Sequence, residues 1–262
     1  MTTCRAGASA TDRLALHAAE LDACGWCLLP AVFESAEVTA MQESLNRAFT
    51  AAESDEAVRR RGAAIYAARN VIDVCPDVAA MWRTELLQEF VSRILGPECG
   101  LVRGLFFDKP PDQTWSLPWH KDLLIAIADE TVAAGYSRPR LRAGVWHTEP
   151  PVEVLEQILT LRIHLDPANA DNGALCVLTG SHRTGKRAAV GFPSQMIHAR
   201  PGDVLAMRPL LSHSSGSSSP ETRSHRRILH LEFASSELLP GGVRWHRFLR
   251  AAGEPHATTS LS

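Results

Sequence analysis

The chain contains no apolar run that approaches the roughly 18–20 residues of a membrane-spanning helix. Its first eight residues also lack the apolar stretch of a secretory signal, so a cytoplasmic location is expected. No dense basic block is present either: 27 Lys and Arg stand against 29 Asp and Glu, and the net charge is −2. These absences argue against a membrane protein and against nucleic acid as a partner.

Cysteine is sparse, and the six cysteines are scattered, which suits reduced thiols better than a disulfide framework. One pair, Cys24-Gly-Trp-Cys27, has the spacing of a redox-active motif. Such a motif requires a strand before it and a helix after it. Here a helical pattern precedes the pair and the extended run Trp26–Leu29 follows it, so redox chemistry is not expected.

Helical spacing of apolar residues predicts three helices in the first hundred residues. The first carries Leu14, Ala18 and Leu21 on one side. The second is expected to begin with Ser35 as its N-cap, and the third with Thr84. This part of the chain therefore reads as mainly helical, with no clear pattern between residues 50 and 75.

From about residue 100 the pattern changes to short β-branched and apolar runs between Pro and Gly turns. The expected strands are residues 100–107, 122–128, 157–166, 174–179, 203–207 and 226–233. Several short strands separated by turns predict a β sandwich or barrel, here with helices in front. We expect one domain over residues 11–250, helical to about 99 and β-rich from about 100, between flexible tails at 1–10 and 251–262.

The segment Leu-Pro-Trp-His120-Lys-Asp122 places a histidine and a carboxylate two residues apart. On an extended segment, side chains at positions i and i+2 point the same way, so both can reach one ion. His213 is the expected third ligand, since it ends a run that begins with the turn Pro201-Gly-Asp203. Two histidines and one carboxylate leave positions of an octahedral iron(II) open for a co-substrate and dioxygen.

A second His-x-Asp, His164-Leu-Asp166, competes with the first. His164 lies inside a predicted strand, whereas His120 follows a Trp- and Pro-rich approach to a strand. We therefore favour His120 and Asp122, and the alternative in which these histidines bind no metal stays open.

A buried arginine is needed if an oxygenase co-substrate with a distal carboxylate binds here, because the guanidinium binds carboxylates in a bidentate manner and stays charged. Arg226 and Arg227 open the strand after His213. Strand alternation puts them on opposite faces, so only one can serve.

A series of motifs resembles the phytanoyl-CoA dioxygenase family. The motifs are Trp119-His120-Lys-Asp122, Asp171-Asn-Gly-Ala-Leu-Cys-Val-Leu-Thr-Gly-Ser-His182, Pro201-Gly-Asp203, His213-Ser-Ser-Gly and Arg226-Arg-Ile-Leu-His-Leu-Glu-Phe-Ala234. The likeness runs from about residue 25 to 247. It implies a mainly β fold, a double-stranded β-helix (jelly-roll, cupin-like) core with flanking helices.

The resemblance also implies iron(II) on His120, Asp122 and His213, with 2-oxoglutarate as co-substrate and dioxygen as oxidant. It assigns the 2-oxoglutarate carboxylate to Arg226 rather than Arg227. The implied activity is a dioxygenase that couples 2-oxoglutarate decarboxylation to hydroxylation of a small molecule through a ferryl species. Desaturation or epoxidation on the same scaffold, a cupin-like metal protein that does not use 2-oxoglutarate, and a non-catalytic binding protein are the alternatives.

Arg162 departs from the family pattern, because better-known relatives carry a tryptophan there. We expect Arg162 to contact 2-oxoglutarate or an anionic substrate group; the alternative is an ion pair with Asp166 or a neighbour. Arg103, Lys109 and His164 are further candidates for the same pocket. These side chains indicate an anionic or amino-acid-like substrate, and a coenzyme A thioester, a free acid and a natural-product intermediate all fit. The sequence leaves the substrate and the oligomeric state open.

Overall fold

The computed structural model of the chain describes residues 10–52, 55–62, 64–111 and 115–251, so the predicted tails lie almost entirely outside the described residues. Residue 10 already belongs to the first helix. Within this part of the chain, no helix combines the length and the apolar character needed to cross a membrane.

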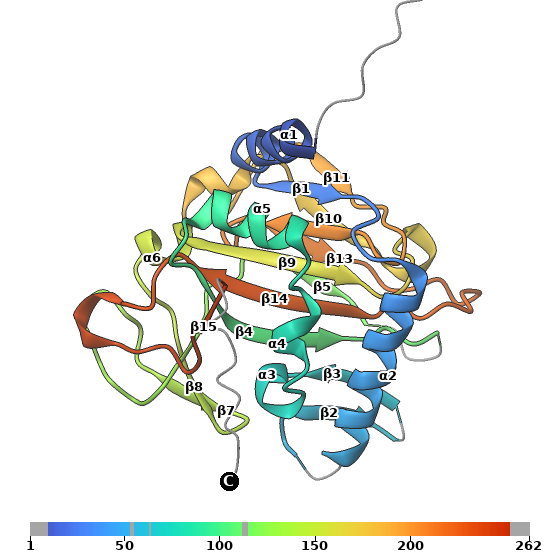
Figure 1. The fold of residues 1–262 in the computed structure, drawn as a ribbon, viewed down its shortest axis with the longest axis horizontal. Helices are drawn as coiled ribbons and strands as arrows, with labels where there is room; N and C mark the ends of the chain where they lie inside the picture. Colours follow the sequence, from blue (N-terminus) through green and yellow to red (C-terminus); the bar gives the residue numbers. More distant parts are fainter. Residues whose placement is uncertain (1–9, 53–54, 63, 112–114, 252–262) are drawn as a thin grey trace, which may run out of the picture.

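The described strands pair antiparallel and form three sheets (Figure 1). The large sheet has the order β1-β12-β9-β14-β4-β3-β2, and β15 pairs with β4. Its strands are β1 (Trp26–Leu29), β2 (Val58–Arg61), β3 (Ala64–Ala68), β4 (Gly100–Phe107), β9 (Ile158–His164), β12 (Val204–Met207), β14 (Ile228–Ala234) and β15 (Leu249–Arg250).

A four-stranded sheet lies behind the large one in the view of Figure 1 and has the order β11-β10-β13-β5. Its strands are β5 (Leu117–His120), β10 (Leu175–Leu178), β11 (Ser194–Met196) and β13 (His213–Ser215). The third sheet joins β6 (Ile125–Ile127), β7 (Arg140–Arg142) and β8 (Val145–Thr148) in the order β6-β8-β7. Two facing antiparallel sheets with flanking helices are a jelly-roll core, as predicted.

Helices cover the front face of the large sheet (Figure 1). They are α1 (Ala10–Cys24), α2 (Ser35–Ala51), α3 (Val71–Val74), α4 (Val78–Met81), α5 (Glu85–Leu95) and α6 (Val152–Glu156), of which α6 lies to one side. Three short 3-10 helices complete the elements: Ala170–Asn172, Ser181–Thr184 and Pro240–Gly242.

The main hydrophobic core lies between these helices and the large sheet. Alternation along β9 sends Leu159, Leu161 and Ile163 to the helix side, where all three are fully buried. On the same side the Trp82 ring packs edge-on against Phe233, with ring centroids 4.6 Å apart. The polar residues of β9 consequently face the other sheet, where the site is built.

The three predicted helices are present, and their starts follow capping chemistry. The Thr84 hydroxyl accepts a hydrogen bond from the backbone N–H of Leu87, which confirms Thr84 as the N-cap of α5. The prediction for α2 was wrong by one residue: Glu34 is the N-cap, and Glu34 and Glu37 form a reciprocal capping box. Ser35 is therefore the first residue of the helix.

Candidate metal centre

Three predicted ligands meet where β5 and β13 lie side by side. His120 ends β5, His213 begins β13, and the two residues are direct cross-strand partners. Asp122 lies just beyond β5, where its backbone N–H donates to the carbonyl of Pro209 at 3.0 Å. One ligand atom from each of the three side chains lies within 4.8 Å of the others. Among the described residues, this group has the donors and the spacing for one metal ion.

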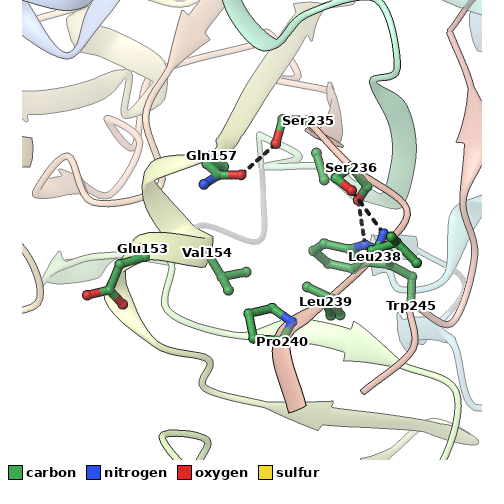
Figure 2. Close-up of a pocket in the computed structure, with 10 residues that line it drawn as sticks. Glu153, Val154, Gln157, Ser235, Ser236, Leu238, Leu239, Pro240 and Trp245 are labelled. Atoms are coloured by element: carbon green, nitrogen blue, oxygen red, sulfur yellow. Dashed lines mark hydrogen bonds between the residues drawn. The ribbon is translucent and has the colours of Figure 1, made fainter. Parts of the chain in front are cut away.

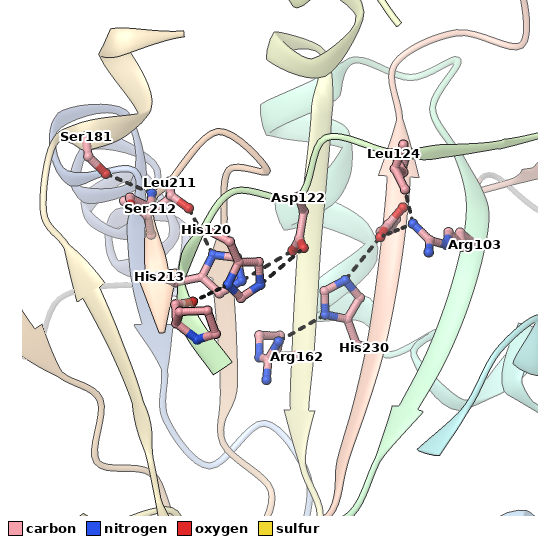
Figure 3. A network of polar contacts seen from close by, with 12 residues as sticks. Arg103, His120, Asp122, Leu124, Arg162, Ser181, Leu211, Ser212, His213 and His230 are labelled. Carbon is pink, nitrogen blue, oxygen red and sulfur yellow. Dashed lines mark hydrogen bonds and ion pairs between the residues drawn. The ribbon is translucent and has the colours of Figure 1, made fainter. Parts of the chain in front are cut away.

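Backbone contacts orient both imidazole rings. The Nδ1 of His120 lies 2.8 Å from the carbonyl oxygen of Pro118, and the Nδ1 of His213 lies 2.9 Å from that of Leu211. A carbonyl can only accept, so the proton belongs on Nδ1 in both rings. Each Nε2 then offers its lone pair toward Asp122, at 4.0 Å for His120 and 3.6 Å for His213 (Figure 3). This arrangement is typical of histidines that bind a metal through Nε2.

The charge states also suit a cation. Burial acts to raise the pKa of Asp122, but His213, His230 and His120 outweigh it and lower that pKa to about 2. Burial lowers the pKa of His213 to about 4. At neutral pH the site therefore presents a carboxylate and a neutral imidazole, the forms that bind divalent metals. The Oδ2 of Asp122 is buried without a hydrogen-bond partner among the described residues, as expected for an atom kept for a ligand.

A cavity of about 50 Å³ adjoins the triad; we call it the metal-side cavity. Arg226 lines it and is only 2% exposed. The Nε and Nη1 atoms of its guanidinium are buried and have no hydrogen-bond partner in the described part of the chain. A cation in this position is left for an anionic ligand to neutralise.

Arg227 points elsewhere. Its Nε and Nη2 donate to the two carboxylate oxygens of Asp166 at 2.7 and 2.8 Å, a bidentate pair. The two neighbouring arginines therefore have opposite surroundings: two guanidinium nitrogens of Arg226 have no partner among the described residues, and Arg227 is already paired. Asp166 is consequently not available to Arg162 or to the alternative metal pair with His164.

Arg162 begins a polar network that runs across the large sheet (Figure 3). Its Nη1 lies 3.1 Å from the Nδ1 of His230, and the His230 Nε2 lies 3.2 Å from the carboxylate of Glu232. Arg103 donates to the same carboxylate at 3.2 Å and to the carbonyl of Leu124 at 2.9 Å. Arg162 also lines the metal-side cavity, and its Nε is unpartnered among the described residues.

Arg162 therefore contacts His230 and not Asp166, the residue named in the alternative to a contact with 2-oxoglutarate or substrate. His230 and Glu232 were not predicted to matter, and their only sequence signal is a polar i, i+2 pair within an apolar strand. The network balances the charge of Arg103 with Glu232, and Arg162 joins Arg226 as a second cation that lines the metal-side cavity.

Lys109 is fully buried and serves the protein itself. Its ammonium donates to the Ser215 hydroxyl at 3.1 Å and to the carbonyls of Gly173 and Gly216. Burial lowers its pKa to about 7, with Arg226 and Arg162 adding to the effect. Gly173 has φ +68°, and a side chain there would collide with the Gly216 carbonyl. Lys109 therefore ties the β13 loop to the turn before β10.

His164 remains apart from the triad. It is 2% exposed, and neither ring nitrogen has a hydrogen-bond partner within the described chain. Burial, together with Arg162 and Arg226, lowers its pKa to about 3, so the ring is neutral. The structure brings together His120, Asp122 and His213, and leaves His164 and Asp166 without a third ligand.

Another cavity, of about 380 Å³, lies between α6 and the segment after β14 (Figure 2). Trp245 donates its indole N–H to the carbonyl of Ser236, and Leu238, 84% exposed, stands at the rim. The cavity shares no lining residue with the metal-side cavity. Its walls supply one carboxylate, Glu153, and no histidine, so it is no second metal centre.

Comparison with known proteins identifies the scaffold. The family model described as phytanoyl-CoA dioxygenase matches residues 21–225. No curated protein matches the chain. Among solved structures, EctD from S. alaskensis with 2-oxoglutarate and 5-hydroxyectoine is 21% identical, with a TM-score of 0.65 and coverage of 91% of this chain and 81% of EctD.

Two further structures share the fold. SnoK, a non-heme alpha ketoglutarate dependent carbocyclase from nogalamycin biosynthesis, is 15% identical, with a TM-score of 0.61 and coverage of 87% of each chain. EvdMO1 is 20% identical with a TM-score of 0.61, and the match covers 85% of this chain but 50% of EvdMO1. This chain therefore spans about half the length of EvdMO1.

Proposed function

This chain belongs to the phytanoyl-CoA dioxygenase family, and from that premise we propose that it is an iron(II)- and 2-oxoglutarate-dependent oxygenase whose metal is held by His120, Asp122 and His213. We further propose that residues 11–250 act as one domain, because both facing sheets contribute ligands or walls to the centre.

The observation that carries the proposal is a group of three ligands beside a cavity. One donor atom from each of His120, Asp122 and His213 lies within 4.8 Å of the others, and all three residues line the metal-side cavity. A structural metal site would instead be closed by a fourth protein ligand. Open positions are what a metal needs if it is to hold a co-substrate and dioxygen together.

The chain's own residues complete the site. Arg226 binds the distal carboxylate of 2-oxoglutarate through the two guanidinium nitrogens that the protein leaves unpartnered. Arg162, held by His230, lies at the same cavity and neutralises negative charge near the metal. Phe107, Leu105 and Leu175 supply apolar walls that exclude water from the reacting atoms.

Iron(II) held by His120, Asp122 and His213, with 2-oxoglutarate held by Arg226, would supply the oxidising chemistry: one oxygen atom of dioxygen would go to succinate as the keto acid loses carbon dioxide, and the other would enter a substrate C–H bond as an alcohol. The hard chemistry belongs to these groups, and the protein supplies orientation. Hydroxylation of a small molecule, one with an anionic group, is the outcome we propose. Desaturation and epoxidation use the same ligands and differ in the substrate presented.

The test is the visible absorption band that forms when anaerobic iron(II) and 2-oxoglutarate are bound together. We expect the band with the unmodified protein and its loss with His213→Ala. Arg226→Gln should need at least about tenfold more 2-oxoglutarate to reach half-maximal absorbance, because it loses a charge-assisted bidentate contact. Arg227→Gln is the matched control and should leave the midpoint unchanged, since its partner is Asp166.

Two outcomes would contradict the proposal. Iron(II) binding without any 2-oxoglutarate-dependent band would favour a cupin-like metal protein. A midpoint raised by Arg227→Gln but unaffected by Arg226→Gln would place the co-substrate on the other face of β14. Succinate formation coupled to oxygen uptake is the corresponding readout of turnover.

A further inference from the structure

A larger cavity, of about 780 Å³, opens beside the metal centre; we call it the arginine cavity. His120 and Asp122 line it, and it shares the walls Leu105, Phe107 and Trp115 with the metal-side cavity. A molecule in the arginine cavity therefore reaches the triad directly. This volume suits a drug-sized ligand.

Four arginines from separate elements line the arginine cavity: Arg59 of β2, Arg69 after β3, Arg103 of β4 and Arg142 of β7. Arg103 is neutralised by Glu232 at 3.2 Å. The guanidinium groups of Arg59, Arg69 and Arg142 have no hydrogen-bond or carboxylate partner among the residues that the structure describes. Three uncompensated cations thus face one space.

The other charged groups of this wall do not balance them. Glu149 pairs with Lys186 at 2.9 Å. Lys121 turns its ammonium to the Thr184 hydroxyl and to backbone carbonyls of the neighbouring 3-10 helix. Asp122 is the proposed metal ligand. The remaining charge of the arginine cavity is therefore strongly positive.

The arginines are close enough to repel one another. Burial lowers the pKa of Arg69, and the nearby Arg103, Arg142 and Arg59 lower it further. Holding like charges together is unfavourable for the free protein, and a bound anion relieves that repulsion. Such an arrangement is typical of a site built for a multiply charged anion.

We propose that Arg59, Arg69 and Arg142 bind a phosphoryl group of the substrate, so that the substrate is a phosphate ester whose apolar part lies toward the metal centre. That the bound molecule is the substrate rests on the proposed function; the anion site itself does not. A phosphate monoester carries about −1.5 to −2 charges and three acceptor oxygens, enough for three guanidinium forks. A single carboxylate carries one charge and leaves two of the arginines uncompensated.

The shape of the arginine cavity supports the apolar part of this substrate. Its apolar walls include Leu105, Phe107, Trp115 and Leu123, and the first three also line the metal-side cavity beside the triad. A hydrocarbon or aromatic segment placed against them brings its C–H bonds to the metal while the phosphoryl group stays at the arginine end. The charged group would thus fix the position of oxidation along the substrate.

The test uses metal-free full-length protein and three matched probes: phenyl phosphate, phthalate and benzoate. Isothermal titration calorimetry should show phenyl phosphate binding at least about tenfold more tightly than benzoate. Arg69→Gln and Arg142→Gln should each weaken phenyl phosphate binding about tenfold, the loss of one charge-assisted contact. Arg47→Gln, which removes an exposed arginine on α2, controls for net charge and should change nothing. Thermal melting of each variant checks folding.

Three results would overturn the proposal. Equal binding of phthalate and phenyl phosphate would mean that the site takes dianions in general and not phosphoryl groups. If Arg226→Gln abolishes phenyl phosphate binding while Arg69→Gln and Arg142→Gln leave it unchanged, the probe binds in the metal-side cavity instead. No binding of any probe would show that the arginines hold no anion. Manganese(II) binding by the same variants is measured separately, so a failure of the triad and a failure of the arginine cavity are distinguished.

Discussion

Replacement of Arg226 by methionine should stabilise the protein in the absence of 2-oxoglutarate. Burial, with repulsion from Arg162, lowers the pKa of Arg226 to about 9, although Asp108 opposes the change. The ordinary value is about 12.5, so the charged form is disfavoured in the fold by more than three pKa units. At about 1.36 kcal/mol per unit, the full penalty is on the order of 4–5 kcal/mol.

Proton linkage gives the pH range in which burying the charged Arg226 destabilises the fold. The folded-state pKa lies below the unfolded one, so the penalty is complete below about pH 9 and fades as the pH rises from there toward the unfolded value. At pH 7 it is therefore fully present. The metal-side cavity has room for a few water molecules, which solvate part of the charge. We expect Arg226→Met to raise the free energy of unfolding by about 2–4 kcal/mol.

Urea unfolding at pH 7 measures the difference in free energy of unfolding between the unmodified protein and Arg226→Met. It is carried out with and without 2-oxoglutarate, with manganese(II) in place of iron. At a 2-oxoglutarate concentration of about 100 times the Kd of the unmodified protein, that protein should gain about 2.7 kcal/mol. Arg226→Met, with binding at least about tenfold weaker, should gain no more than about 1.4 kcal/mol. Arg227→Met is the control: it breaks the bidentate pair with Asp166, so it should lose about 1–3 kcal/mol and keep its response to 2-oxoglutarate. If Arg226→Met is instead the less stable protein without ligand, the guanidinium is already satisfied and the reasoning is refuted.

Three further predictions concern single side chains. Burial lowers the pKa of His147 to about 4, so on acidification the unfolded state binds a proton before the folded state does. The free energy of unfolding should therefore fall by about 3 kcal/mol between about pH 6.5 and pH 4, and His147→Gln should lose less stability over that range. His120→Ala should weaken manganese(II) binding at least tenfold in equilibrium dialysis, whereas His164→Ala should leave it unchanged, and the reverse result would move the metal to the other motif. Trp82→Ala should cost about 3–5 kcal/mol in urea unfolding, since its fully buried ring packs on Phe233; a loss below 1 kcal/mol would mean that the core closes around the gap.

The parts of the fold that follow a local period were predictable from the sequence. The predicted strand 100–107 coincides with β4, and the strand 157–166 contains β9. The strands β5 and β13 were not predicted, because Leu117–His120 and His213–Ser215 are short, contain proline or serine, and do not alternate. They are strands because they pair with each other across nearly a hundred residues.

The same contrast holds for the site. His120 and Asp122 could be identified from the sequence because side chains two residues apart on an extended segment point the same way. Arg59, Arg69 and Arg142 could not, since residues 50–75 show no clean period and nothing local says that β2, β3 and β7 share a cavity. Charge that gathers from several elements is visible only after the chain has folded.

The edge position of β5 has a consequence for the protein without its metal. β5 is the last strand of the β11-β10-β13-β5 sheet, and Trp119 beside His120 is 46% exposed. A metal bound by His120, Asp122 and His213 would link this edge strand to β13 through two of its ligands. Without iron, β5 would then separate first and expose the edge of β13. An unpaired strand edge is a template for aggregation. The metal would in that case stabilise the sheet as well as take part in the reaction.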